Sequence, residues 1–182
     1  MNEPFDRPRV VAKTDDPVGA DVKARLGVMA RMLVTLDGLW FRNVLAAVGP
    51  EQALAMDIRV FKGQFRIATR VIREHFGTDG KSRRDKAVVL EQMARLYGHD
   101  FEIIDEPGAV TMRLHRCAFL DALRAAGRTD HDCRAVCRAL RPAWFEEIEP
   151  RTGGAGEVRL GLPDGTGTCD WSVVHPPDEP SE

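Results

Sequence analysis

The spacing of apolar residues changes once along the chain, and this change constrains the fold more than any other feature. From about residue 21 to residue 97, apolar residues recur every three or four positions, as in helices that bury one face. From about residue 101 the spacing shortens to two, as in strands with one buried side. The pattern therefore predicts a helical first half and a strand-containing second half.

Three helices are predicted in the first half, at about residues 21–48, 51–76 and 82–97. Gly49-Pro50 separates the first two, since glycine often ends a helix and proline often begins one. Ser82 is placed to cap the third helix, and Asp85 three residues later completes a loose capping box.

Two hairpins and two further helices are predicted in the second half. The strands are expected at about 101–106, 110–116, 157–162 and 168–175, and the helices at about 118–126 and 132–140. Arg141-Pro142 is expected to break the second of these helices, because proline lacks the N–H that continues one, and Pro142 can open a further turn through Trp144 and Ile148. The order ααα-ββ-αα-ββ is typical of an α+β fold, with an N-terminal helical layer packed on a small antiparallel sheet.

The ends of the chain differ in composition from the rest. Residues 1–18 are polar and contain three prolines, and residues 176–182 read Pro-Pro-Asp-Glu-Pro-Ser-Glu. Such segments do not bury enough apolar surface to offset the entropy of ordering, so both are predicted to be disordered. Residues 19–175 are predicted to form a single domain.

Charge and composition exclude several classes of protein. The 182 residues include 28 acidic and 26 basic ones, so the net charge is only −2, which argues against a nucleic-acid or membrane partner. Neither an apolar leader nor an 18-residue apolar run is evident, so a cytoplasmic location is expected. The four cysteines are then expected to be thiols rather than disulfides.

Cys117 is the main candidate for chemistry, because it lies where a predicted strand meets a predicted helix. A helix N-terminus lowers the pKa of a thiol and makes it nucleophilic. His115 would be its base, and Asp170 on the last strand would orient His115 if the two strands are adjacent. The alternative is structural: a buried Cys117, a surface His115 and a solvated Asp170.

Metal binding is a second reading of the cysteines. Cys133 and Cys137 are four residues apart, and the short Cys-x-x-Cys pairs of zinc sites are absent. Either Cys117, one of these two and Cys169 converge, with His115 or His131 as the fourth ligand, or all are ordinary thiols. We expect the second case, with no metal and no cofactor.

Asp37 is the main candidate for ligand binding, because it interrupts the apolar face of the first helix between Leu33 and Trp40. A charge on a buried face is costly unless it is paired. Asp37 therefore either bonds an arginine or lines a pocket. The residues predicted to line such a pocket are Asp37, Trp40, Trp144, Cys169 and Trp171.

Several short stretches together resemble a known family, the L-2-amino-thiazoline-4-carboxylic acid hydrolases, and a related bacterial family with the same layout. They are Leu36-Asp-Gly-Leu-Trp-Phe41, Ala53-Leu-Ala-Met-Asp57, Cys117-Ala-Phe119, Cys133-Arg-Ala-Val-Cys137, Trp144-Phe145 with Ile148 and Pro150, and Cys169-Asp-Trp-Ser172. The C-terminal half is also similar to the small-molecule-binding domains named after vinyl reductase. The chain departs from the pattern at Ala118, where the family usually has proline, and it lacks extra cysteines near residues 158–163.

The resemblance implies hydrolysis of a cyclic amidine or another non-peptide C–N bond. Cys117 would be the nucleophile, His115 the base, and Asp170 or Asp37 the orienting acid. The alternative is a domain of the vinyl-reductase type that binds a small molecule without turnover. A third reading is a homodimer formed through the two long helices that begin the domain.

Overall fold

The computed structural model describes residues 9–13, 20–125, 127 and 133–176. Its helices are α1 (Ala20–Val48), α2 (Pro50–Phe76), α3 (Arg83–Leu96), α4 (Ala118–Ala125) and α5 (Cys133–Ile148). Its strands are β1 (Arg9–Lys13), β2 (Asp100–Glu106), β3 (Ala109–Arg116), β4 (Gly156–Leu160) and β5 (Cys169–Val174). Short 3-10 turns occupy Pro150–Thr152 and Leu162–Asp164. The predicted α+β class and element order are confirmed.

The strands form one antiparallel sheet in the order β1-β2-β3-β5-β4. The edge strand β1 corrects a prediction, because residues 9–13 were expected to belong to a disordered arm. An unpaired edge of β2 would present a row of free backbone N–H and C=O groups, and β1 pairs with that edge. Of the other residues predicted to be disordered, 1–8, 14–18 and 177–182 lie outside the described ranges, and Pro176 is described without regular secondary structure.

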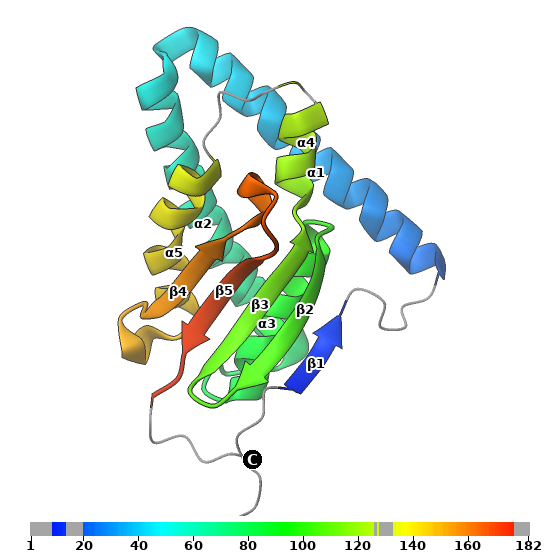
Figure 1. Ribbon diagram of the computed structural model, residues 1–182, viewed down its shortest axis with the longest axis vertical. Coiled ribbons are helices and arrows are strands. Elements are labelled where there is room, and N and C mark those ends of the chain that lie inside the picture. Colours follow the sequence, from blue (N-terminus) through cyan, green and yellow to red (C-terminus); the bar gives the residue numbers. More distant parts are fainter. Residues whose placement is uncertain (1–8, 14–19, 126, 128–132, 177–182) are drawn as a thin grey trace, which may run out of the picture.

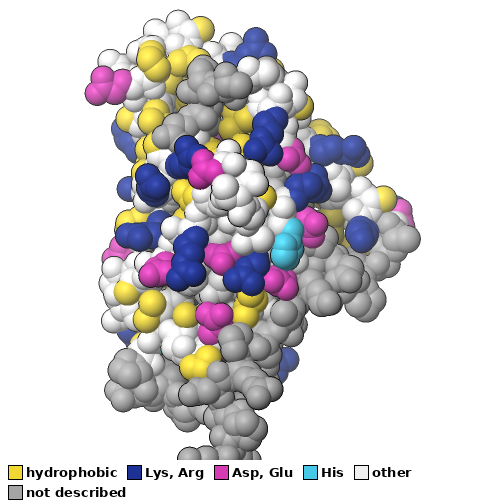
Figure 2. Space-filling view, in the orientation of Figure 1, with side chains coloured by type: hydrophobic (Ala, Val, Ile, Leu, Met, Phe, Trp, Pro, Cys, Tyr) yellow, Lys and Arg dark blue, Asp and Glu magenta, His cyan; other side chains and the backbone are white. Residues whose placement is uncertain are grey.

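Helices cover one face of the sheet, and the other face carries charged groups. Figure 1 shows α2 and α3 behind the sheet and β1 and β4 at its two edges. Alternate residues of the central strands point into the helical layer: Val110, Met112, Leu114, Cys169, Trp171 and Val173 all belong to the buried core. Figure 2 shows acidic and basic side chains interspersed over the outward face.

The helix boundaries follow the local signals in the sequence. Gly49 and Gly77 adopt φ values of 82° and 65°, which favour glycine, at the ends of α1 and α2. The Ser82 hydroxyl accepts a hydrogen bond of 3.1 Å from the Asp85 N–H and caps α3. Although α1 and α2 are long, no helix in the described part of the chain has both the length and the apolar character needed to cross a bilayer.

Helix α5 continues through Pro142 to Ile148, so the predicted break at this proline is wrong. Trp144, Phe145 and Ile148 lie on the same buried face as the residues before the proline. Burying these three side chains offsets the loss of one backbone hydrogen bond. The chain also packs closely here, since a Cβ on Gly154 would lie 2.5 Å from the Pro142 carbonyl oxygen.

A buried ionic cluster fastens the end of α5 to α3 and to the end of the sheet. Lys86 Nζ lies 2.8 Å from Glu149 Oε2 and 2.7 Å from His175 Nδ1, and the Lys86 and Glu149 side chains are fully buried. Arg151 donates to both Glu149 oxygens. Desolvation raises the pKa of Glu149, but hydrogen bonds from Arg151 and Lys86 outweigh it and lower the pKa to about 2.

Candidate functional site

A cavity of about 350 Å³ lies between the helical layer and the sheet. Its wall is largely apolar and is built from α1, α2, the end of α3, β3, α4, α5 and β5. Concave, mostly apolar sites of roughly 300–1,000 Å³ are typical of small-molecule binding sites. This cavity is therefore the leading candidate for a functional site in the described part of the chain.

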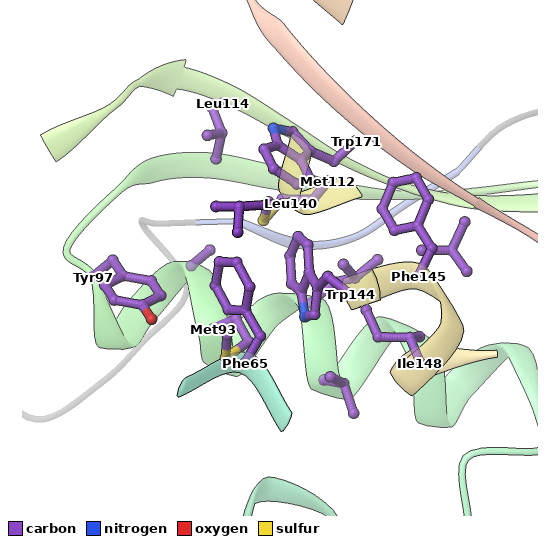
Figure 3. Close-up of a cluster of buried hydrophobic side chains, with 14 of the residues drawn as sticks. Phe65, Met93, Tyr97, Met112, Leu114, Leu140, Trp144, Phe145, Ile148 and Trp171 are labelled. Carbon is purple, nitrogen blue, oxygen red and sulfur yellow. The ribbon is translucent and has the colours of Figure 1, made fainter. Parts of the chain in front are cut away.

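Aromatic side chains form much of the cavity wall. Phe65 of α2 stacks on Trp144 of α5, with ring centroids 4.9 Å apart. Trp144 meets Trp171 of β5 edge to face at 5.1 Å, and Tyr97 meets Phe65 edge to face at 6.3 Å. Figure 3 shows Trp171 of the sheet above Phe65 and Trp144, whose rings lie side by side. Rings packed on one another in this way hold a rigid apolar surface.

All four cysteines line this one cavity, although they come from three different parts of the chain. They are Cys117, Cys133, Cys137 and Cys169. Among the described residues, no group of three or more His, Cys, Asp or Glu side chains is arranged to hold a metal ion. His131, one of the two predicted fourth ligands, lies outside the described ranges, and His115 does not line the cavity.

Cys117 caps the N-terminus of α4, as its position in the sequence predicted. Its sulfur accepts hydrogen bonds from the backbone N–H groups of Leu120 and Phe119, which lower its pKa. Burial acts in the opposite direction and dominates, so the pKa of the Cys117 thiol is raised to about 11. The expectation of an activated thiolate therefore finds no support at Cys117, because burial of the charge outweighs stabilisation by the helix end.

His115 and Asp170 lie on the outward face of the sheet, away from the cavity. Asp170 accepts two hydrogen bonds of 3.0 Å from the Arg113 guanidinium, and His115 Nε2 lies 3.7 Å from Glu102 Oε1. Successive side chains of a strand point to opposite faces, so His115 points away from the side on which Leu114 is buried. The predicted arrangement of Cys117, His115 and Asp170 is not formed.

Two carboxyl groups, Asp37 of α1 and Asp57 of α2, line the cavity. Asp57 is 3% exposed, and its Oδ1 atom has no hydrogen-bond partner in the described part of the chain. Burial raises the pKa of Asp37 to about 6. Burial and the nearby charge of Asp37 raise the pKa of Asp57 to about 7.

Three further polar groups lie in the cavity wall. The Tyr97 hydroxyl and the Trp144 indole nitrogen are buried, and neither has a hydrogen-bond partner among the described residues. His99 Nδ1 accepts a hydrogen bond from the Ala118 N–H, so the ring proton is on Nε2. Burial, with a smaller contribution from Arg116, lowers the pKa of His99 to about 4, so its ring is neutral at pH 7.

The sequence predicted part of this site. Asp37, Trp144, Cys169 and Trp171 line the cavity as expected, whereas Trp40 does not. Asp57, Tyr97 and His99 were missed. Asp57 carried a usable signal, because it interrupts the buried stripe of α2 in the same way that Asp37 interrupts that of α1.

Comparisons with family models, with curated proteins and with solved structures find no match to this chain. The account of function therefore depends on the geometry of the cavity.

Proposed function

We propose that this protein binds a small, mostly apolar molecule in the cavity between its helices and its sheet, without turning it over. The observation that carries the proposal is a cavity of about 350 Å³ with an aromatic wall and a few buried polar atoms that have no partner in the described part of the chain. Buried polar atoms normally have partners, so those that lack one inside a cavity favour a ligand that supplies it.

The size of the cavity sets the expected affinity. A ligand that loses roughly 300 Å² of apolar surface gains about 7.5 kcal/mol at about 25 cal/mol per Å². Part of this gain is offset by the lost freedom of the ligand. Unoptimised apolar probes of the right size are therefore expected to bind in the micromolar to millimolar range.

Binding is favoured over hydrolysis because Cys117, the predicted nucleophile, is not activated. At neutral pH a thiol with a pKa of about 11 is almost wholly protonated. The two groups predicted to assist it, His115 and Asp170, lie on the outward face of the sheet and do not line the cavity. The hydrolase reading would require Cys117 to act without them.

The test is a fluorescence titration with N-phenyl-1-naphthylamine, a neutral probe that brightens in apolar surroundings. Saturable brightening with one site per chain is expected. The variant Val136→Phe adds volume to the cavity wall and is expected to weaken binding at least about tenfold. Val88→Phe is the control, because Val88 packs against the core but does not line the cavity. Equal binding by both variants would rule out this site.

A second function, self-association, is favoured by apolar stripes on α1 and α2. The exposed stripe residues are Val22, Leu26, Met29, Met32 and Leu36 on α1, and Met56, Val60, Ile67 and Val71 on α2. Within each helix their spacings of three, four and seven place them on one side. Each exposes between 37% and 67% of its surface. Contiguous exposed apolar surface of this kind marks interaction sites.

We propose that a second copy of the chain covers these stripes. These nine exposed apolar side chains offer surface that a second copy would bury, and a standard stable interface buries roughly 800 Å² on each partner. Gly63 lies within the α2 stripe, with nothing near its Cβ position. An exposed helical glycine costs about 1 kcal/mol relative to alanine, and close approach of a partner helix would offset that cost.

Sedimentation velocity over a range of concentrations tests this dimer. The chain is expected to be a dimer at micromolar concentration, and Leu36→Glu with Ile67→Lys is expected to give a monomer with an unchanged circular dichroism spectrum. Phe76→Lys changes a similarly exposed side chain outside the stripe and is expected to leave the dimer intact. A chain that is monomeric at all concentrations would exclude the dimer.

A further inference from the structure

The polar part of the cavity wall is predominantly acidic. Asp37 and Asp57 both line it, and neither forms an ion pair with another described residue. Arg42 is the only arginine or lysine among the described residues of the wall, and its side chain is exposed. Tyr97 and His99 are neutral at pH 7, because burial raises the pKa of the Tyr97 hydroxyl and lowers that of the His99 ring.

Asp57 is the less well compensated of the two carboxyl groups. It is 3% exposed, and no described protein group forms a hydrogen bond with its Oδ1 atom. Carboxyl groups are rarely buried to this degree without a cation or several hydrogen-bond donors. Glu149 is also buried, but its carboxyl group contacts both Lys86 and Arg151.

A protonated amine would supply the positive charge and the hydrogen-bond donors that this acidic part of the wall lacks. An ammonium group has three N–H donors and no acceptor, so it can donate to two carboxylates and to the Tyr97 oxygen together. The aromatic wall beside it, including Phe65 and Trp144, suits an apolar body attached to the amine. An anionic head group would instead meet two carboxyl groups and one exposed arginine.

We infer that the cavity takes an amphipathic cation, with an apolar body held among the aromatic side chains and a protonated amine held between Asp37 and Asp57. This inference rests on the proposed binding function and specifies the class of its ligand.

Proton linkage supports the inference. Burial raises the pKa of Asp37 to about 6 and, together with the charge of Asp37, that of Asp57 to about 7. A bound cation stabilises the ionised carboxylates and lowers both pKa values, so protons leave the site on binding near pH 7. The other titratable or charged groups of the wall are Arg42 on α1, Tyr97 and His99 after α3, and the four thiols.

The test compares three probes that share one apolar body, namely 4-phenylbutylamine, 4-phenylbutanol and 4-phenylbutyrate. Each is titrated against the wild-type protein at pH 7.5 by displacement of N-phenyl-1-naphthylamine. The amine is expected to bind at least about tenfold more tightly than the alcohol, and the carboxylate most weakly. Calorimetry in two buffers of different ionisation enthalpy is expected to show proton release with the amine and none with the alcohol.

The double variant Asp37→Asn, Asp57→Asn is expected to lose the preference for the amine while it keeps the affinity for the alcohol. The retained alcohol binding shows that the variant is folded, and Asp37→Asn alone serves if the double variant is unstable. Asp21→Asn is the matched control, because Asp21 is an exposed acid of α1 paired with Arg25 and outside the cavity. It is expected to retain the full preference.

Other outcomes separate this inference from the proposed function. Equal affinities for amine and alcohol, or an unchanged preference in the Asp37 and Asp57 variants, would overturn the inference and leave the apolar site standing. Tightest binding of the carboxylate would overturn it in favour of Arg42 as the head-group contact. Failure of every probe, including the neutral fluorophore, would overturn the proposed function itself.

Discussion

The two faces of the sheet place the same kinds of residue in opposite surroundings. On the outward face, Asp170 is held by two hydrogen bonds from Arg113, which also contacts Glu102. On the helix-covered side, Asp57 of α2 is buried in the cavity wall, and one of its oxygens has no partner among the described residues. The outward acid is therefore satisfied by the protein, whereas the cavity acid is available to a ligand.

The difference shows why neighbours in the sequence are poor guides to a site on a sheet. Cys169, Asp170 and Trp171 are consecutive, yet Cys169 and Trp171 line the cavity and Asp170 does not. Backbone pleating points them to opposite faces, so a functional site on a sheet is assembled from alternate residues of a strand and from helices distant in the sequence.

The largest expected effect is a loss of stability. It is tested by substituting two neighbouring residues of β5 that point to opposite faces of the sheet. Trp171→Ala removes a ring that packs on Trp144 and Phe145 and is expected to lower the free energy of unfolding by about 3–5 kcal/mol. Ser172→Ala removes only a hydroxyl contact with Thr111 and is expected to cost about 1 kcal/mol. Urea denaturation measures both, and similar losses would contradict the division between the faces.

A loss of stability of nearly the same size is expected when the buried, paired carboxylate of Glu149 is removed. Glu149→Gln removes the carboxylate that pairs with Lys86, whose side chain has no solvent exposure. A loss of about 3–5 kcal/mol in the free energy of unfolding is expected at pH 7. A variant as stable as the wild type would show that Lys86 does not depend on this pair.

Asp57→Asn is expected to raise, rather than lower, the free energy of unfolding. The pKa of Asp57 is about 3.8 when the chain is unfolded and about 7 when it is folded, so its ionisation opposes folding increasingly between these values. At pH 8 the variant is expected to be more stable than the wild type by roughly 2–4 kcal/mol, at 1.36 kcal/mol per pKa unit. Thermal or urea unfolding across pH measures this difference in stability, which is expected to vanish near pH 3.

The smallest change in stability is expected for a substitution of Asp170, on the outward face of the sheet. Asp170→Asn weakens its pair with Arg113, whose side chain is 35% exposed, so a loss of about 1 kcal/mol or less is expected at pH 7. Added salt is expected to reduce it further. A gain in stability here, like that expected for Asp57→Asn, would remove the contrast between the two acids.

Most of the fold could be predicted because its signals are local. The spacing of apolar residues and the glycine and serine caps placed the long helices and both hairpins close to their positions in the structure. Strand β1 and the continuous helix through Pro142 could not be predicted, since each depends on tertiary contacts. The edge of β2 supplies the partner in the first case, and the buried face of α5 offsets the proline in the second.

The site was less predictable than the fold. Asp37 was identified because a charge on an apolar helix face is conspicuous, and Asp57 shows the same signal within its own stripe. The pKa of Cys117 could not be inferred, because its position at a helix start indicates a lowered value while burial by distant elements raises it. The convergence of four cysteines on one cavity likewise depends on how the helices and strands pack.

The measurement that most directly tests binding without turnover is the rate of Cys117 alkylation by iodoacetamide as a function of pH, followed by mass spectrometry. A rise in pKa from 9.0 to about 11 lowers the thiolate fraction at pH 7.5 about 100-fold relative to a free thiol. We expect correspondingly slow labelling that rises up to high pH and slows further with 4-phenylbutylamine bound. Fast, selective labelling of Cys117 below pH 8 would contradict the account and would indicate an activated thiolate of the kind a cysteine hydrolase uses.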